Sequence, residues 1–343
     1  MLTVLDTLPS GLLQREASEL YQVLPGPTLI HLPGRRQPPL LVSVLLHGNE
    51  VTGWLALRKL LQHYQQKAFP RALSILIGNV EAARWGQRHL DHQPDFNRIW
   101  TEGDRPEHRM AQQVMAEMRQ RGLFASVDVH NNSGRNPHYA CVNRTDPAHL
   151  HLATLFGRTV LYFTKPDGVQ TMAMGRYGPA VVLECGLPDQ PHGTDHAYEF
   201  LQACLHLSHL PERPVLAQDI DLFHTVAVVK IPHEVEFGFG DLERDACGYD
   251  ILFPADLDHL NFQELPPHTP LGRINGGFRL DVRDETGAEV SQRFFYTQSD
   301  RVLTAVPVMP GMLSLNSRII RQDCLCYLME RYPLPSTPQP IPA

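Results

Sequence analysis

The sequence lacks a cysteine framework, a long apolar run and a basic stretch, and each absence argues against a class of protein. Its 6 cysteines are scattered, and no two form a Cys-x-x-Cys pair, so free and mostly buried thiols are expected. No apolar run approaches the roughly 20 residues of a membrane-spanning helix. The first residues lack the basic segment and apolar core of a signal peptide. We therefore expect a cytoplasmic protein with no membrane partner.

Positive charge is also in deficit. Lysine and arginine together number 30 against 37 acidic residues, which gives a formal net charge of −7. Without a basic patch or stripe, a nucleic-acid partner is not expected. The length of 343 residues is too great for one small core and favours one large domain or two.

Hydrophobic periodicity divides the chain into two parts. Up to about Pro214, apolar strands alternate with amphipathic helices, which predicts an α/β fold with a mixed, largely parallel sheet flanked by helices. The expected strands are Leu40–Leu46, Leu73–Ile77, Phe124–Val129 and Ala180–Leu183. Short β-like runs follow, with one helix expected over Ser317–Arg331. The predicted organisation is an N-terminal extension (1–39), an α/β domain (40–214), a smaller β-rich domain (215–332) and a disordered tail (333–343).

Three expected strands end in residues that can bind zinc or transfer a proton. The first is followed by His47 and Glu50, the third by His130 and the fourth by Glu184. Read alone, each could be an ordinary polar residue at a strand end. Parallel strands, however, bring their carboxyl ends to one edge of a sheet, where ligands bind. Two histidines and a glutamate form the ligand set of several zinc hydrolases, and Glu184 is the natural proton acceptor and donor.

Arginines in the loop after the second strand add a second signal. Asp95-Phe96-Asn97-Arg98 contains one of them, and Arg88 lies ten residues before Arg98. A guanidinium group binds a carboxylate through two parallel hydrogen bonds. The alternative is that both arginines are solvated loop residues.

In combination these motifs resemble the succinylglutamate desuccinylase/aspartoacylase family of the zinc carboxypeptidase superfamily. The resemblance spans roughly residues 40 to 315 and rests on motifs in a fixed order. They are His47-x-x-Glu50, Asn97-Arg98, Asp128-Val129-His130-Asn131 and Leu183-Glu184-Cys185-Gly186. The resemblance implies a zinc-carboxypeptidase-like catalytic domain followed by a small C-terminal β domain.

The resemblance also implies a role for each residue. His47, Glu50 and His130 would hold Zn²⁺, and Glu184 would act first as general base and then as general acid. Arg88 would help to polarise the scissile carbonyl. Asn97 and Arg98 would grip the free carboxylate of a small-molecule substrate. The resemblance also points to Tyr296 in the β-rich domain as a substrate contact. Independently of it, the polar loop after His130 offers Arg135 as a second contact for a carboxylate or phosphate, with ordinary turn chemistry as the alternative.

The sequence departs from the family in ways that leave the substrate open. His89 stands where the family usually has tyrosine, and the segment Gly168–Met174 has no arginine to bind an acidic side chain. The leading hypothesis is a zinc hydrolase that cleaves the amide bond of an N-acyl amino acid or a similar small amide. The alternatives are a zinc carboxypeptidase acting on a peptide or peptide-like polymer, and a non-enzymatic sensor on a hydrolase scaffold.

Overall fold

The computed structural model describes residues 1–243, 248–276 and 280–334. Its backbone divides into two compact units, the first built mainly from Met1–Asn131 and His138–Leu222 and the second from Asn132–Pro137 and Phe223–Tyr332. The predicted disordered tail falls almost wholly outside the described residues, as does Cys247. Among the described residues, no helix combines the length and apolar character needed to cross a membrane.

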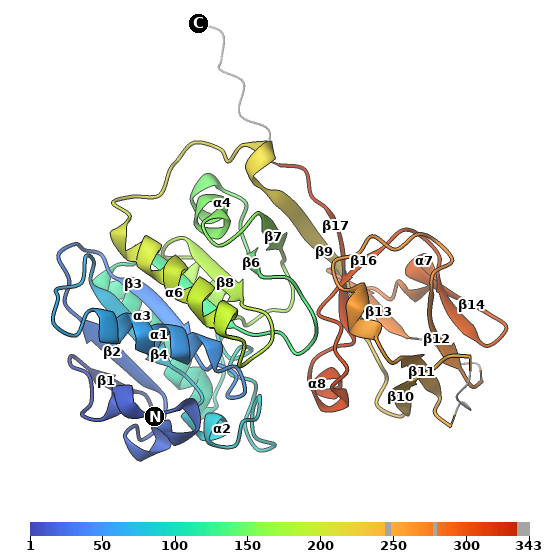
Figure 1. Ribbon diagram of the computed structural model, residues 1–343, viewed down its shortest axis with the longest axis horizontal. Helices are drawn as coiled ribbons and strands as arrows, with labels where there is room; N and C mark the ends of the chain where they lie inside the picture. Colours follow the sequence, from blue (N-terminus) through green and yellow to red (C-terminus); the bar gives the residue numbers. More distant parts are fainter. Residues whose placement is uncertain (244–247, 277–279, 335–343) are drawn as a thin grey trace, which may run out of the picture. The chain divides into compact units, whose positions relative to one another are not determined.

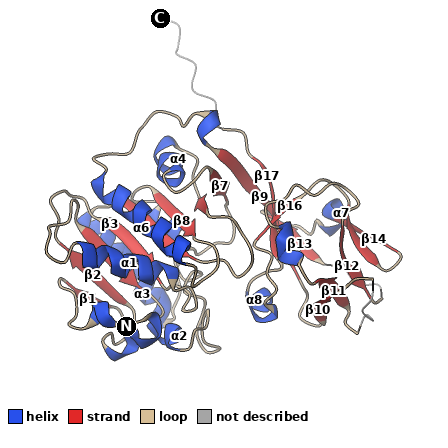
Figure 2. Ribbon diagram, in the orientation of Figure 1, coloured by secondary structure: helices blue, strands red, loops and turns tan. Residues whose placement is uncertain are grey.

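The first unit contains one mixed, mostly parallel sheet, as expected (Figure 2). In sheet order its strands are β1 (Thr3–Leu5), β2 (Thr28–Leu32), β4 (Leu73–Ile77), β3 (Leu40–Val44), β5 (Ala125–His130), β8 (Ala180–Glu184), β6 (Tyr139–Val142) and β7 (Thr159–Tyr162). Strands β3, β4, β5 and β8 run parallel to their neighbours in that set. Strand β2 is antiparallel to β4, and β6 is antiparallel to β8.

Helices cover both faces of this sheet. They are α1 (Thr52–His63), α2 (Val80–Arg84), α3 (Pro106–Arg121), α4 (Pro147–Thr154), α5 (Gln170–Met174) and α6 (Pro191–His206). Helices α1 and α6 lie side by side on one face (Figure 1). Gly53 of α1 packs against Val44 and Val129, whereas Val114 of α3 joins a core cluster with Leu41 on the other face. Both faces are therefore buried, which explains why these strands read as continuous apolar runs.

Strand register brings the candidate residues to one edge of the sheet. Val44 near the end of β3 pairs with Val129, and His130 at the end of β5 pairs with Glu184 at the end of β8. The loop that carries His47 and Glu50 starts directly after β3. The expected convergence of three strand ends is thus a property of the fold.

Several elements differ from the sequence expectation. Residues 1–39, expected as an extension, supply β1, β2 and two 3-10 helices (Leu12–Gln14 and Ala17–Gln22). Every residue of β2 is buried, and the strand pairs along its length with β4. Hydrogen bonding to the sheet therefore makes this segment part of the first unit.

The second unit is β-rich, in agreement with the sequence. Strand β9 (Asp221–Lys230) pairs with β13 (Asp281–Asp284) and β17 (Cys326–Arg331), and β17 pairs with β16 (Met309–Gly311). A separate sheet has the order β10 (Phe237–Gly240), β11 (Ile251–Pro254), β12 (Pro270–Ile274), β15 (Arg301–Thr304) and β14 (Phe295–Gln298). In this unit a short 3-10 helix covers Leu257–Leu260 and α7 covers Ser291–Phe294, whereas the 3-10 helix Ala217–Asp219 belongs to the first unit.

The helix expected over Ser317–Arg331 is wrong in its second half. Helix α8 covers only Ser317–Gln322, and Cys326–Arg331 form β17, an antiparallel partner of β9. The apolar run Leu325–Met329 is buried and suits a strand within a sheet as well as a helix. Periodicity alone does not separate these two structures in a short apolar run.

Candidate metal centre and catalytic site

A tight loop between β3 and α1 places His47 and Glu50. Gly48 in this loop has no room for a side chain, because an ideal Cβ would lie 2.2 Å from the backbone nitrogen of Ala83. Its amide donates to the carbonyl of Arg88 at 3.1 Å. Close backbone contact with α2 and with the following loop therefore holds this turn at the end of β3.

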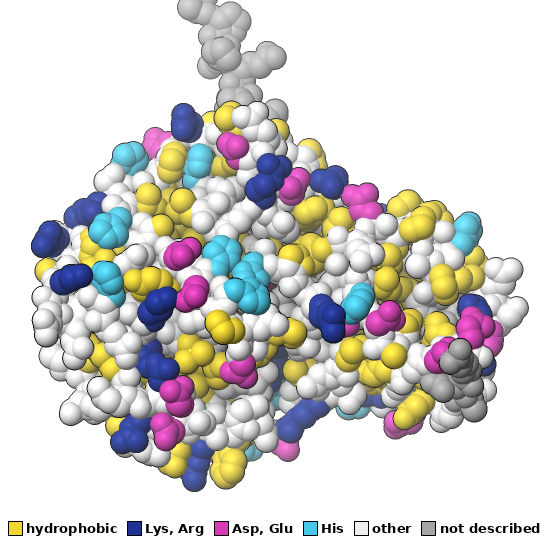
Figure 3. All heavy atoms as spheres, in the orientation of Figure 1, with side chains coloured by type: hydrophobic (Ala, Val, Ile, Leu, Met, Phe, Trp, Pro, Cys, Tyr) yellow, Lys and Arg dark blue, Asp and Glu magenta, His cyan; other side chains and the backbone are white. Residues whose placement is uncertain are grey.

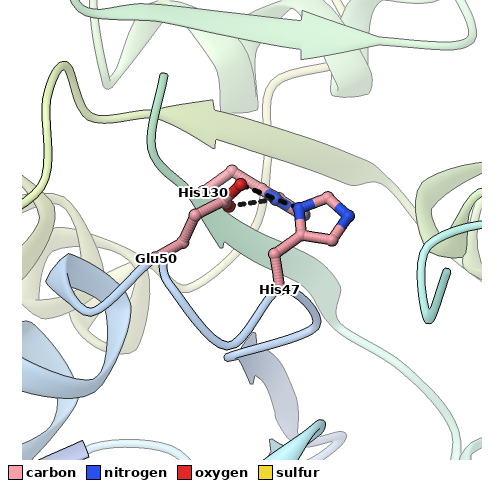
Figure 4. Close-up of side chains that lie close together, drawn as sticks. All are labelled: His47, Glu50 and His130. Atoms are coloured by element: carbon pink, nitrogen blue, oxygen red, sulfur yellow. Dashed lines mark hydrogen bonds and ion pairs between the residues drawn. The ribbon is translucent and has the colours of Figure 1, made fainter. Parts of the chain in front are cut away.

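His47, Glu50 and His130 form a compact, buried cluster (Figure 4). Glu50 lies between the two imidazoles, with Oε1 2.8 Å from His47 Nδ1 and Oε2 2.7 Å from His130 Nδ1. One ligand atom from each residue lies within 4.8 Å of the others. The amide of Asn131 also donates to Glu50 Oε2, at 3.1 Å, so the carboxylate is held from three sides.

The far nitrogen of each imidazole meets a second carboxylate. His47 Nε2 lies 3.0 Å from Asp95 Oδ1, and His130 Nε2 lies 2.9 Å from Asp128 Oδ2. Nε2–H donation to a carboxylate fixes the ring orientation and leaves Nδ1 directed at Glu50. Histidines that bind metals almost always make such an outer hydrogen bond.

The charges of this cluster stabilise one another. Burial favours the neutral histidine, but the carboxylates of Asp128 and Glu50 outweigh it and raise the pKa of His130 well above its usual value. The pKa of His47 is likewise raised, by Glu50 and Asp95 against burial and the Arg88 charge. Burial opposes ionisation of Glu50, yet the two histidines hold its pKa far below normal. A bound metal ion would supply the positive charge instead, because histidine binds a metal as the neutral imidazole.

Glu184 lies at the end of β8, in register with His130, and its side chain is buried. Burial raises the pKa of Glu184 to about 7, with a further contribution from the Glu50 charge, while His130 lowers it. A general base works best when its pKa lies near the operating pH.

The loop after α2 places the predicted arginines. Arg88 donates from Nε and NH2 to Asp95 Oδ2, at 3.1 and 2.9 Å, and its NH1 lies 4.0 Å from Glu50 Oε1. Arg98, half-buried, donates from NH1 to the carbonyl of Asn97 at 2.8 Å. Asn97 Nδ2 lies 3.4 Å from His130 Nε2. Arg88 and Asn97 therefore reach the cluster of His47, Glu50 and His130, and Arg98 adjoins it through Asn97.

The segment that carries these residues has known relatives. Residues 36–197 match the model of the succinylglutamate desuccinylase/aspartoacylase catalytic domain. This segment belongs to that family. The match includes His47, Glu50, His130 and Glu184, and it confirms the resemblance found in the sequence motifs.

Solved structures share the fold of the family over most of the chain. The succinylglutamate desuccinylase from Chromobacterium violaceum is 17% identical with a TM-score of 0.56, over 88% of this chain and 87% of that one. Murine aminoacylase 3 is 16% identical with a TM-score of 0.54, over 87% and 97%. The ectoine utilization protein EutE from Ruegeria pomeroyi is 15% identical with a TM-score of 0.52, over 81% and 88%. No curated protein matches the sequence.

Arg135 and Tyr296, the two expected substrate contacts outside this cluster, belong to the second unit. Arg135 is exposed, and its backbone amide donates to Asp258 at 3.1 Å. The hydroxyl of Tyr296 bonds to His268 Nδ1 at 2.7 Å. Their contact with a substrate stays a prediction.

Sequence reasoning gave no role to Asp95 or Asp128, although both lie within the family motifs. Asp128 stands two positions before His130, and residues at that spacing share one face of a strand. Asp95 is a carboxylate in a loop that also carries Arg88. These spacings were the available signals, and the structure shows that both carboxylates bind the histidines from outside.

Proposed function

We propose that the protein is a zinc-dependent hydrolase that cleaves the amide bond of an N-acyl amino acid or a similar small carboxylate-bearing amide. The observation that carries the proposal is the placement of Glu184 in register beside His130, at the edge of the sheet where the His47–Glu50–His130 cluster lies. The relatives support the same chemistry, because their names are those of a desuccinylase and an aminoacylase.

The donor set fits zinc. Two imidazole nitrogens and one carboxylate are the three protein ligands of a catalytic zinc site, and a fourth position stays open. The Nδ1 atoms of both histidines face Glu50, and Asp95 and Asp128 hold their Nε2 atoms. Zinc bound here would lower the pKa of a coordinated water to about 7 and polarise the scissile carbonyl.

Glu184 would move the proton. Its carboxylate accepts a proton from the attacking water as the carbon–oxygen bond forms, and then donates that proton to the amide nitrogen as the carbon–nitrogen bond breaks. The products are a carboxylic acid and an amine. A buried carboxyl with a pKa of about 7 both accepts and releases a proton near neutral pH.

Arg88 and a carboxylate clamp, defined as Asn97 and Arg98, would orient the substrate. Asp95 holds the Arg88 guanidinium on one side, with NH1 toward Glu50, so this cation adjoins the carbonyl that is attacked. The amide of Asn97 and the guanidinium of Arg98 supply donors for a free carboxylate.

We also propose that the protein works in the cytoplasm. Reduced, buried cysteines are usual in that compartment, and the cysteines of the described residues are buried thiols.

The test combines metal analysis with a substrate panel. We expect purified protein to bind about one zinc, and to hydrolyse at least one of a set of N-acyl amino acids that varies the acyl group and the amino acid. Glu184→Gln should keep the metal and lose turnover by a factor of about 100 to 10,000. His47→Ala should lose both. Metal-free wild-type protein with unchanged turnover would refute the proposal.

A zinc carboxypeptidase is the competing function, because the same residues could remove a C-terminal residue from a peptide. The panel therefore includes dipeptides and longer peptides that end in the same amino acid. Under our proposal, kcat/KM falls as the acyl group is lengthened into a peptide. A value that rises with peptide length would favour the carboxypeptidase.

A further inference from the structure

Gln170, the first residue of α5, is a polar side chain with no exposed surface. Its amide nitrogen donates to two serine hydroxyls, Ser43 Oγ at 2.9 Å and Ser126 Oγ at 3.1 Å. Both serines are also fully buried. A buried amide that satisfies two hydroxyls on separate strands is costly to replace, because an apolar side chain leaves those hydroxyls unpaired.

The two serines belong to the strands that lead to the candidate metal ligands. Ser43 lies on β3, which leads to His47 and Glu50, and Ser126 lies on β5, which ends at His130. The Gln170 side chain therefore ties the start of α5 to both strands beneath the candidate metal centre.

The backbone before α5 holds the carboxylate clamp. The backbone N–H of Gln170 donates to Asn97 Oδ1 at 3.0 Å. The backbone N–H of Trp100 donates to the carbonyl of Gly168, also at 3.0 Å. Gly168 has a φ of +78°, and an ideal Cβ there would lie 2.5 Å from the carbonyl oxygen of Arg98. The segment Gly168–Gln170 and the clamp thus lie in direct backbone contact.

These contacts determine how Asn97 presents its amide. Because Oδ1 accepts from the Gln170 backbone, Nδ2 must point the other way, toward His130. Asn97 Nδ2 thus lies 3.4 Å from His130 Nε2, at the edge of the candidate metal centre, where an amide N–H is within reach of a substrate oxygen bound beside His130. The orientation of the donor follows from the position of Gln170.

We propose that Gln170 is a positioning residue that sets the carboxylate clamp relative to the metal centre. It acts through Asn97 and touches no substrate itself. The inference rests on the proposed function, since it assigns the geometry by which that site selects molecules with a free carboxylate.

The test uses two ways of removing the link and one matched control. Gln170→Leu removes both donors, and the double variant Ser43→Ala with Ser126→Ala removes both acceptors while keeping Gln170. The control is Thr171→Val, at the next position of α5, where the buried hydroxyl has no hydrogen-bond partner within the part of the chain that the structure describes.

The first readout is hydrogen–deuterium exchange over residues 96–100, which needs no activity. The Trp100 amide donates directly to the Gly168 carbonyl. Loosening the segment Gly168–Gln170 therefore breaks this hydrogen bond more often and exposes the Trp100 amide to exchange. We expect at least about tenfold faster exchange in Gln170→Leu and in the double serine variant. Thr171→Val should match the wild type. Unchanged exchange in both link variants would overturn the inference, whether or not the protein is a hydrolase.

The second readout is selectivity, which a merely structural residue would not move. Each variant is assayed with the best N-acyl amino acid and with the same molecule as its C-terminal carboxamide. We expect Gln170→Leu to lower kcat/KM for the carboxylate by about tenfold to 100-fold, with little change for the carboxamide. Combined with Asn97→Ala, it should add almost nothing further.

The two proposals fail in different ways. A wild-type enzyme that prefers the carboxylate, with Gln170→Leu retaining that full preference, would overturn the role of Gln170 alone. A wild-type protein that hydrolyses no member of the panel would overturn the proposed function. The exchange measurement would then still decide whether Gln170 positions the Asn97–Arg98 loop.

Discussion

Replacing Glu184 by glutamine should make the metal-free protein more stable at alkaline pH, although it removes the proposed proton carrier. The reason is the cost of ionising a carboxyl that is buried beside Glu50 and Asp128. This cost is set by the difference between the pKa of about 7 in the folded protein and the ordinary value of 4.5. At about 1.36 kcal/mol per pKa unit, the difference corresponds to about 3 kcal/mol.

The sign follows from proton binding. Below pH 4.5 the carboxyl is protonated in both states and contributes nothing. Between about 4.5 and 7 the unfolded chain loses the proton and the folded protein keeps it, so the free energy of unfolding falls as pH rises. Above about pH 7 the whole penalty is present. Glutamine has no such penalty at any pH.

The assay is urea unfolding of chelator-treated wild type and Glu184→Gln at about pH 5 and about pH 8. We expect the stability gain of the variant to be roughly 2 to 3 kcal/mol larger at the higher pH. Glu212→Gln is the control, because Glu212 is exposed, and its effect should be near zero at both pH values. A gain for Glu184→Gln that is the same at both pH values would refute the argument that burial holds this proton.

Three further outcomes follow from the site. Asp128→Asn replaces the carboxylate that binds His130 Nε2 at 2.9 Å, and we expect zinc affinity, measured by competition with a chelating dye, to fall by about 10-fold to 100-fold. Gly48→Ala puts a methyl group 2.2 Å from the backbone of Ala83; the variant should lose about 2 kcal/mol or more in thermal unfolding, and wild-type stability would contradict the packing. Arg98→Ala should raise KM for an N-acyl amino acid at least about tenfold with a smaller effect on kcat, and an unchanged KM would remove Arg98 from the clamp.

Sequence reasoning reached the site because its residues follow apolar strands. His47, His130 and Glu184 each stand at a strand end, and parallel strands end at one edge of a sheet. The same reasoning missed β6 and β7, which are only four residues each and carry no strong periodicity. It also separated the first 39 residues from the sheet, since the pairing of β2 with β4 is a long-range contact that no local pattern encodes.

The supporting network was harder to predict than the ligands. Gln170 lies 73 positions from Asn97 and 127 from Ser43, so only the folded chain shows that they meet. Asp95 bonds to His47 across 48 positions. Ligand identity follows from residue type at strand ends, whereas orientation depends on contacts between loops that are distant in the sequence.

The measurement that bears most directly on the central claim is hydrolysis of the N-acyl amino acid panel by metal-free protein before and after one equivalent of Zn²⁺ is added. We predict turnover only after the addition, and none in His47→Ala at the same zinc concentration. Equal turnover with and without zinc, or turnover in zinc-treated His47→Ala that matches the wild type, would contradict it.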